Sequence, residues 1–165
     1  MDRIDAYYKS DDLSQIDFQA YVVELSRQLS NTLTAKDGRI SIALDVDCVM
    51  LDIEKAIPCG MIVNELVTNA IEHAFPRGRE GTVTVTFQRA DQQYVLSVGD
   101  NGAGLPEGFA PSKSASLGLR VVELLAKQLG GTLSVSDKQG AVFSIKFADA
   151  AQTQANNPKT TCDRP

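Results

Sequence analysis

Two neighbouring segments alternate apolar and polar residues in the way of strands that bury one face. In TVTVTF, residues 82–87, threonines alternate with Val83, Val85 and Phe87. The segment YVLSVGD, residues 94–100, follows after the turn ADQQ. A period of two places the apolar side chains on one face of a sheet. A chain built on half-buried strands of this kind needs a second layer to cover that face, and helices are the usual one.

Segments with helical or strand periodicity flank this pair in a definite order. Apolar residues from Phe18 to Leu29 recur at helical spacing after Asp17, which predicts an N-capped helix to about residue 32. The other expected elements are a strand at 39–46, a helix at 58–74 with Pro58 in its first turn, a helix at 118–131, and strands at 132–136 and 141–147. This order predicts an α+β fold, a two-layer sandwich of one mixed sheet with helices on one face.

The expected elements fill one domain. A chain of 165 residues is long enough for one domain with a substantial core. We expect residues 14–148 to form that domain. Residues 149–165 have almost no apolar content and are predicted to be a disordered polar tail. Residues 1–13, MDRIDAYYKSDDL, are predicted to be the end of a helix followed by a polar connection.

Composition excludes several classes of protein. The formal net charge is −5 and no stretch gathers Lys and Arg, which argues against nucleic acid as the main partner. No apolar run reaches the length of a membrane span, and no signal peptide opens the chain. The three cysteines, Cys48, Cys59 and Cys162, fit no zinc pattern. We therefore expect reduced thiols in a cytoplasmic protein.

The helix expected at 58–74 carries an unusual polar face. At 100° per residue, Glu65, Asn69, Glu72 and His73 fall on one stripe opposite an apolar arc. A solvated helix face is the common interpretation of such a stripe, but solvated faces favour Lys, Glu and Arg over Asn. An amide beside a carboxylate is a good oxygen pair for Mg²⁺, which takes one or two protein oxygens together with phosphate oxygens. The helix can therefore present a metal–phosphate site.

A loop with two glycines follows the strand that ends at Asp100. In GDNGAGLPEG, residues 99–108, Gly102 and Gly104 let a flat ligand approach the backbone, and Asp100 can accept a hydrogen bond from an amine such as that of adenine. The spacing fits neither GxGxxG nor a P-loop. Gly118, in SLGLR, opens the next helix and can expose N–H groups to a phosphate. Residues 105–116 between these sites are a candidate mobile lid.

The segments AIPCGMIVNELVTNAIEHAFP, DNGAGLPEGF, SLGLRVVELLAKQLGG and GAVFSIKF together resemble a known family. They are similar to the catalytic ATP-binding domain of bacterial sensor histidine kinases, within the gyrase, Hsp90, histidine kinase and MutL superfamily. The subgroup with a variant dimerisation hairpin is the most similar. The resemblance covers roughly residues 14–148 and implies a Bergerat-type ATPase fold. Residues 1–13 resemble the remnant of the hairpin's second helix.

The resemblance implies a role for each matching residue on the polar helix. Asn69 would be the Mg²⁺ ligand, and Glu65 lies where related ATPases place a water-activating base. We therefore assign catalytic roles to Glu65 and Asn69. His73 lies where the family often has His or Tyr near the nucleotide. As a phosphoacceptor or a metal ligand it is disfavoured, so the two remaining roles are a contact at the edge of the nucleotide site and an exposed helix residue.

The resemblance also assigns the glycine-bearing segments to the nucleotide. Asp100 would bind the adenine amine, with Gly102 and Gly104 shaping that wall. Gly118 and Leu119 would form a second glycine box at the phosphates, and Ser116 would be a further contact to the nucleotide. The implied ligands are ATP and Mg²⁺, and the implied partners are a dimerisation hairpin that bears the acceptor histidine, in cis or in trans, and a response regulator.

Three departures from the family pattern bear on function. Glu72 stands where the family usually has Lys or Arg, and Ala141 replaces a Thr that often supports the adenine site. No histidine precedes His73, so the phosphoacceptor of the family is absent from this chain. The leading hypothesis is a kinase domain that transfers the γ-phosphoryl group of ATP to a histidine on a separate segment or chain. The alternatives are a degenerate module that docks a response regulator without turnover, and a serine kinase of the anti-sigma-factor type.

Overall fold

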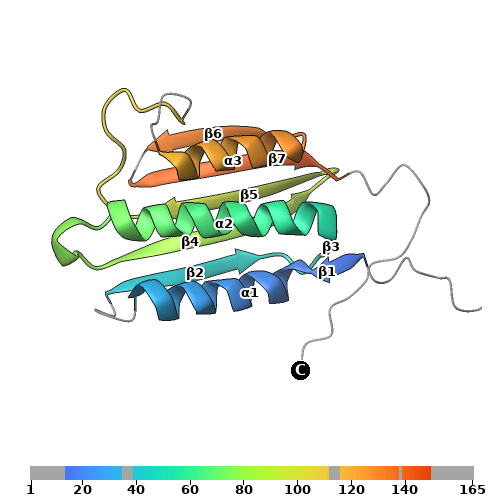
Figure 1. The fold of residues 1–165 in the computed structure, drawn as a ribbon, viewed down its shortest axis with the longest axis horizontal. Coiled ribbons are helices and arrows are strands. Elements are labelled where there is room, and N and C mark those ends of the chain that lie inside the picture. The colour runs from blue at the N-terminus through green and yellow to red at the C-terminus, as the bar shows by residue number, and fades with distance from the viewer. Residues whose placement is uncertain (1–13, 35–38, 112–115, 138, 150–165) are drawn as a thin grey trace, which may run out of the picture.

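The chain forms a two-layer α+β sandwich. The structure is a computed structural model. It describes residues 14–34, 39–111, 116–137 and 139–149. Three helices lie side by side across one face of a sheet, roughly along its strands (Figure 1). They are α1 (Phe18–Leu29), α2 (Ile53–His73) and α3 (Leu117–Gln128). The predicted fold class is confirmed.

The main sheet has five strands in the order β2-β4-β5-β7-β6. Its strands are β2 (Ile40–Val46), β4 (Gly81–Ala90), β5 (Gln93–Asp100), β6 (Thr132–Asp137) and β7 (Ala141–Ala148). The β2 and β4 strands are parallel and the other neighbours are antiparallel, so the sheet is mixed as expected. A short separate ladder pairs β1 (Gln15–Asp17) with β3 (Met50–Asp52). Strands of three residues are too short for alternation to reveal, and the sequence did not indicate them.

The core lies between the sheet and the helices. Val83, Val85 and Phe87 are fully buried on one face of β4, and the intervening threonines are only partly covered on the other. The Phe87 ring lies 4.5 Å from that of Phe18 on α1 and 5.3 Å from that of Tyr94 on β5, measured between centroids. Burial of one such side chain contributes about 1.5–3 kcal/mol. The alternation in TVTVTF therefore predicts correctly which face the helices cover.

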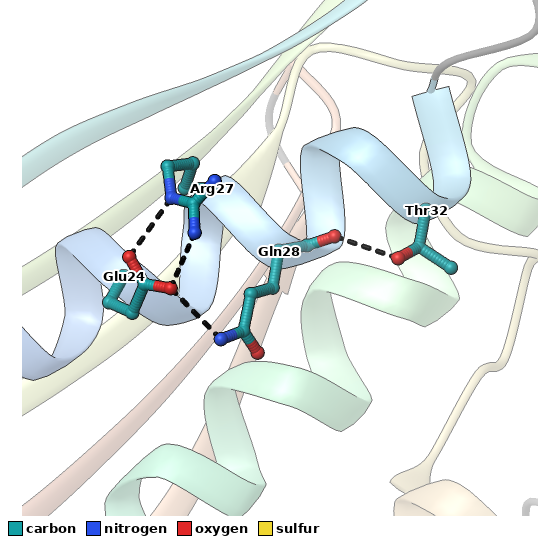
Figure 2. A network of polar contacts seen from close by, with 4 residues as sticks. All are labelled: Glu24, Arg27, Gln28 and Thr32. Atoms are coloured by element: carbon teal, nitrogen blue, oxygen red, sulfur yellow. Dashed lines mark hydrogen bonds and ion pairs between the residues drawn. The ribbon is translucent and has the colours of Figure 1, made fainter.

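The first helix begins as expected. The Asp17 carboxylate accepts a hydrogen bond from the Ala20 amide at 3.0 Å, as the N-cap prediction requires. After Leu29 the chain continues as a turn of π-helix, Ser30–Thr34. On the outer face of α1, the Glu24 carboxylate accepts hydrogen bonds from Arg27 and Gln28, and the Thr32 hydroxyl donates to the Gln28 carbonyl (Figure 2). The Arg27 hydrogen bonds lower the pKa of Glu24 to about 2.

The start of the second helix was predicted wrongly. We expected the helix to begin at Pro58, but α2 begins at Ile53 and carries Pro58 inside it. A proline at that position forfeits one hydrogen bond, to the carbonyl four residues earlier. Pro58 is buried, and the helix continues without interruption to His73. A short 3-10 turn, η2 (Pro76–Gly78), follows.

The structure bears on the expectations for the cysteines and for membrane-spanning segments. Cys59 is free and buried, whereas Cys48 is disulfide-bonded, so the expectation of reduced thiols is wrong for Cys48. Within the described ranges, no helix is both long and apolar enough to cross a membrane. The predicted helix end at 1–13, most of the polar tail and Cys162 lie outside the described residues. Asp149, at the start of that predicted tail, is buried and pairs with Arg89.

Candidate functional site

A cavity of about 420 Å³ opens where the C-terminal half of α2, the end of β5 and the start of α3 meet. The loop that follows Asp100 forms one of its walls. The polar residues around it are Asn69, His73, Asp100 and Ser116, and the glycines are Gly99 and Gly104. The rest of the lining is apolar and includes Leu66, Val98, Phe109, Leu119 and Phe143. A mostly apolar hollow with a few convergent polar groups is the usual form of a small-molecule site.

The second helix supplies one wall through its periodicity. Val63 and Val67 are fully buried against the sheet, which fixes the rotation of the helix about its axis. Asn69 and His73, at i and i+4, consequently lie on the side that lines the cavity. Asn69 is half-buried, whereas the His73 side chain is 76% exposed and therefore lies at the rim. The polar stripe is thus only partly a solvated face.

Glu65 approaches the site from behind Gly118. A Cβ atom added to Gly118 would lie 2.7 Å from the Glu65 Oε2 atom and within 4 Å of both terminal atoms of the Asn69 amide. Glu65 and Asn69 therefore meet around one point at the first turn of α3. Neither Glu65 nor Gly118 lines the cavity itself. The glycine at this position lets the start of α3 approach the two polar side chains of α2.

Asp100 lies at the end of β5, where its carboxylate contacts the Gly102 amide and lines the cavity. Its Oδ1 atom accepts a hydrogen bond from the Gly102 amide at 2.8 Å, which turns the chain immediately after the strand. An ionised carboxylate has about four acceptor positions, so this bond leaves capacity for a ligand. Asp100 lines the cavity beside Gly99 and Ala141. A donor in the cavity, such as an exocyclic amine, can therefore reach a fixed carboxylate.

Gly102 and Gly104 have different structural roles. A Cβ atom at Gly102 would lie 2.2 Å from the Ala74 carbonyl oxygen, and the next amide, of Ala103, donates to that oxygen at 2.8 Å. Gly102 therefore allows the loop to lie directly on the end of α2, outside the cavity lining. Gly104 lines the cavity and has φ +79°, a left-handed conformation that favours glycine.

Six of the eight predicted nucleotide contacts come together around the cavity. They are Asn69, His73, Asp100, Gly104, Ser116 and Leu119. Gly102 and Gly118 lie one layer behind it. The sequence did not indicate Phe109 and Phe143, whose rings meet edge to face with centroids 6.2 Å apart. Apolar residues in a loop and a strand carry no signal that separates a site wall from the core.

Glu72 does not line the cavity. Its carboxylate lies 3.9 Å from the neighbouring His73 imidazole, and the side chain is 56% exposed. Exposed charges are screened by water and salt, so this carboxylate opposes an anion in the cavity less than its sequence position suggests. Ala141 does line the cavity and is almost fully buried, so the hydroxyl that the family often has there is missing from the wall.

No group of three or more His, Cys, Asp or Glu side chains is placed to hold a metal ion within the described part of the chain. A site that depends on Asn69, Glu65 and the phosphate oxygens of a ligand does not require such a group.

Comparison with known proteins places the chain among ATP-binding domains. Residues 54–151 match the family model described as histidine kinase-, DNA gyrase B- and HSP90-like ATPase. The sensor histidine kinase PdtaS of Mycobacterium tuberculosis is 39% identical over 118 residues, which cover 70% of this chain and 24% of that protein. Blue-light-activated histidine kinase 2 of Erythrobacter litoralis is 32% identical over 130 residues, which cover 77% of this chain and 37% of the relative.

The structural comparison agrees with these sequence matches. The histidine kinase domain of the blue-light activated histidine kinase from Erythrobacter litoralis EL346 superposes with a TM-score of 0.74 at 28% identity, over 83% of this chain and 63% of that one. This chain spans about a quarter of the length of the mycobacterial relative, 24%.

Proposed function

The chain belongs to the family of histidine kinase-, DNA gyrase B- and HSP90-like ATPases, and we propose that it is the kinase domain of a sensor histidine kinase. In this proposal it binds ATP with Mg²⁺ and transfers the γ-phosphoryl group to a histidine on a separate segment or chain. The relatives named above are sensor histidine kinases, which supports the assignment. The partners would be a dimerisation hairpin that bears the acceptor and a response regulator, and the domain would work in the cytoplasm.

One observation carries the proposal more than any other. Residues from α2, the end of β5 and the start of α3, far apart in the chain, surround one cavity, and they include six of the eight residues proposed to contact the nucleotide. A cavity of about 420 Å³ is within the usual range for small-molecule sites. Its apolar walls, including Phe109 and Phe143, suit a flat base.

We assign the recognition of adenine to the β5 end of the cavity. Asp100 would accept a hydrogen bond from the exocyclic amine, and its bond to the Gly102 amide would hold the carboxylate in place. Gly104 would form the adjacent wall, where its left-handed backbone, φ +79°, lies along the cavity. The missing hydroxyl at Ala141 would cost affinity but would leave the Asp100 contact intact.

We assign the phosphates to the junction of α2 and α3. The amides at the start of α3, around Gly118 and Leu119, would donate to phosphate oxygens, and the helix dipole favours negative charge there. Asn69 would supply the oxygen ligand for Mg²⁺, with Glu65 beside it. Bound Mg²⁺ would neutralise charge on the transferring group. The side chains of the protein would chiefly position the nucleotide, as in other phosphoryl transfers.

The acceptor would come from outside this domain. His73, the single histidine of the chain, is part of α2 and lies at the rim of the same cavity. Its helix is packed on the sheet by fully buried residues and is not free to turn toward a bound phosphate. A separate element that carries a histidine would approach the open side of the cavity.

Two measurements test the proposal. Calorimetry should detect ATP binding with Mg²⁺ at submillimolar affinity, and Asp100→Asn should weaken it by about tenfold, because Asn keeps an oxygen that can accept the hydrogen bond but loses the charge that strengthens it. Asp45→Asn, on the exposed edge strand β2, is the matched control and should bind as the wild type does. Millimolar or weaker binding with no response to Asp100→Asn would refute the site.

Phosphoryl transfer is tested separately from binding. With a histidine-bearing hairpin and radiolabelled ATP, acid-labile label should collect on the hairpin. Acid-stable label would indicate a serine kinase instead. Tight binding without transfer would favour the second candidate, a non-catalytic module that docks a response regulator, which the buried Ala141 in the cavity wall motivates.

A further inference from the structure

The loop after Asp100 is tied down by three successive hydrogen bonds. The Gly102 amide donates to the Asp100 carboxylate at 2.8 Å, and the Ala103 amide donates to the Ala74 carbonyl at 2.8 Å. The Leu105 amide then donates to the Asp137 Oδ2 atom at 3.1 Å. The first two bonds fix the loop to its own strand and to α2. The third fixes it to the end of β6.

Asp137 is the last residue of β6 and is exposed to solvent. It is paired in register with Ala141, which lines the cavity, but Asp137 itself does not. Its carboxylate packs directly against Gly104, where an added Cβ atom would lie 2.7 Å from Oδ1 and 3.2 Å from Oδ2. One side chain therefore both accepts the Leu105 hydrogen bond and supports the Gly104 backbone. It acts on two residues that line the cavity.

The backbone at Gly104 needs an external restraint. Glycine enters the left-handed region as readily as the right-handed one, so φ +79° is not enforced by the residue itself. The following Pro106 has no amide hydrogen to donate, and the next backbone bond, from the Phe109 amide to the Pro106 carbonyl at 3.1 Å, is internal to the loop. Among the residues that the structure describes, the Asp137 bond is thus the tie that holds the peptide between Gly104 and Leu105 in one orientation.

We propose that Asp137 is a positioning residue for the nucleotide: its carboxylate fixes the Gly104–Leu105 peptide and thereby places the cavity wall that begins at Gly104. This inference rests on the proposed ATP site. Leu105, Pro106 and Phe109 all line the cavity beyond this point. Without the tie, binding must also order the start of the loop, so affinity falls although no contact to the nucleotide is removed.

The test compares three variants of the full chain. Asp137→Ala removes the acceptor, whereas Asp137→Asn keeps a side-chain oxygen that can accept from Leu105. Asp45→Ala removes a carboxylate from the far edge strand β2 as the matched control. We expect Asp137→Ala to bind ATP with Mg²⁺ about three- to tenfold more weakly, the worth of one hydrogen bond. Asp137→Asn should lie within about twofold of the wild type, and Asp45→Ala should match the wild type.

Hydrogen exchange of the Leu105 amide is the second readout, measured without nucleotide. Exchange should be faster in Asp137→Ala than in the wild type and should be restored in Asp137→Asn. Equal ATP affinity in Asp137→Ala and the wild type would overturn the inference while leaving the proposed function in place. Equal weakening in Asp137→Ala and Asp137→Asn, with a matching loss of thermal stability, would show a purely structural role and also overturn it.

If the wild type itself fails to bind ATP, the proposed function is wrong and the positioning role falls with it. Unchanged Leu105 exchange in Asp137→Ala would refute the tie whether or not ATP binds.

Discussion

Replacement of Gly102 by alanine should detach the loop from the end of α2. The added Cβ atom would lie close to three atoms of Ala74: 2.2 Å from the carbonyl oxygen, 2.6 Å from the Ala74 Cβ atom and 2.7 Å from the carbonyl carbon. Two of these are main-chain atoms and the third is a Cβ atom fixed to the main chain at the end of a packed helix, so they cannot move aside as a flexible side chain can. Overpacking of this kind costs about 1–3 kcal/mol if the loop stays in place.

The loop has a second option that costs a similar amount. If it lifts away, it loses the bonds from the Gly102 amide to Asp100 and from the Ala103 amide to Ala74, both 2.8 Å long. Two such bonds contribute about 1–3 kcal/mol together. Whichever option the chain takes, the free energy of unfolding should fall by about 1–3 kcal/mol. If the loop lifts, ATP binding should weaken by up to about tenfold, because the Asp100 carboxylate loses the bond that orients it.

Chemical denaturation and calorimetry with ATP measure the two effects. Gly108→Ala is the control, since Gly108 has φ +73° but an added Cβ atom would meet nothing within 4 Å. That variant should lose roughly 1–2 kcal/mol from backbone strain and keep the ATP affinity of the wild type. Our account of the loop is wrong if Gly102→Ala stays within about 0.5 kcal/mol of the wild type and binds ATP equally well.

Three further changes test the fold. Asp17→Ala removes the cap that accepts the Ala20 amide bond and should lower the free energy of unfolding by about 0.5–2 kcal/mol in urea titrations, with Asp17→Asn close to the wild type. Phe87→Ala empties a fully buried position and should cost about 3–5 kcal/mol, a loss that a small change in thermal midpoint would contradict. Burial raises the pKa of the Cys59 thiol to about 12, so a thiol reagent at pH 8 should label Cys59 only after unfolding. Because this pKa lies above the value of about 8.5 in unfolded chains, the stability that it contributes is complete below pH 8.5 and is lost as pH rises toward 12. The free energy of unfolding, measured at increasing alkaline pH, should show that loss, and the loss should be smaller in Cys59→Val.

Local pattern predicted the parts of the fold that depend on local contacts. Strand β4 was predictable because its own side chains alternate. Helix α1 was predictable because Asp17 caps it by a hydrogen bond from an amide only three residues further along the chain. The start of α2 was not, because Pro58 usually marks a first turn and here lies inside the helix. The β1–β3 pair depends on contacts between segments 35 residues apart, which no local period encodes.

The site divides in the same way. The 3.6-residue period places Asn69 and His73 on one face of α2, so their proximity follows from sequence. The position of Asp100 beside them depends on how β5 lies under α2, and only the resemblance to a family indicated it. Asp137 had no signal, because its role follows from where the β6–β7 hairpin ends relative to the loop. Residues that support a site from behind are the ones that sequence reasoning misses.

Glu72 is the residue that most opposes a kinase assignment on sequence grounds, and its position weakens that objection. Asn69 and Glu72 are three residues apart on α2, yet only Asn69 lines the cavity. The Glu72 carboxylate is beside the His73 imidazole at the exposed rim. An exposed carboxylate repels a nearby phosphate much less than a buried carboxylate would, because the effective dielectric constant is high and salt screens the charge. The family's cation at this position would have attracted the phosphates from the rim, so its absence removes an attraction more than it adds a barrier. In the proposed site, neutralisation of the phosphates then depends on Mg²⁺ at Asn69 and on the amides that begin α3, which makes Asn69 the residue whose loss the activity should tolerate least.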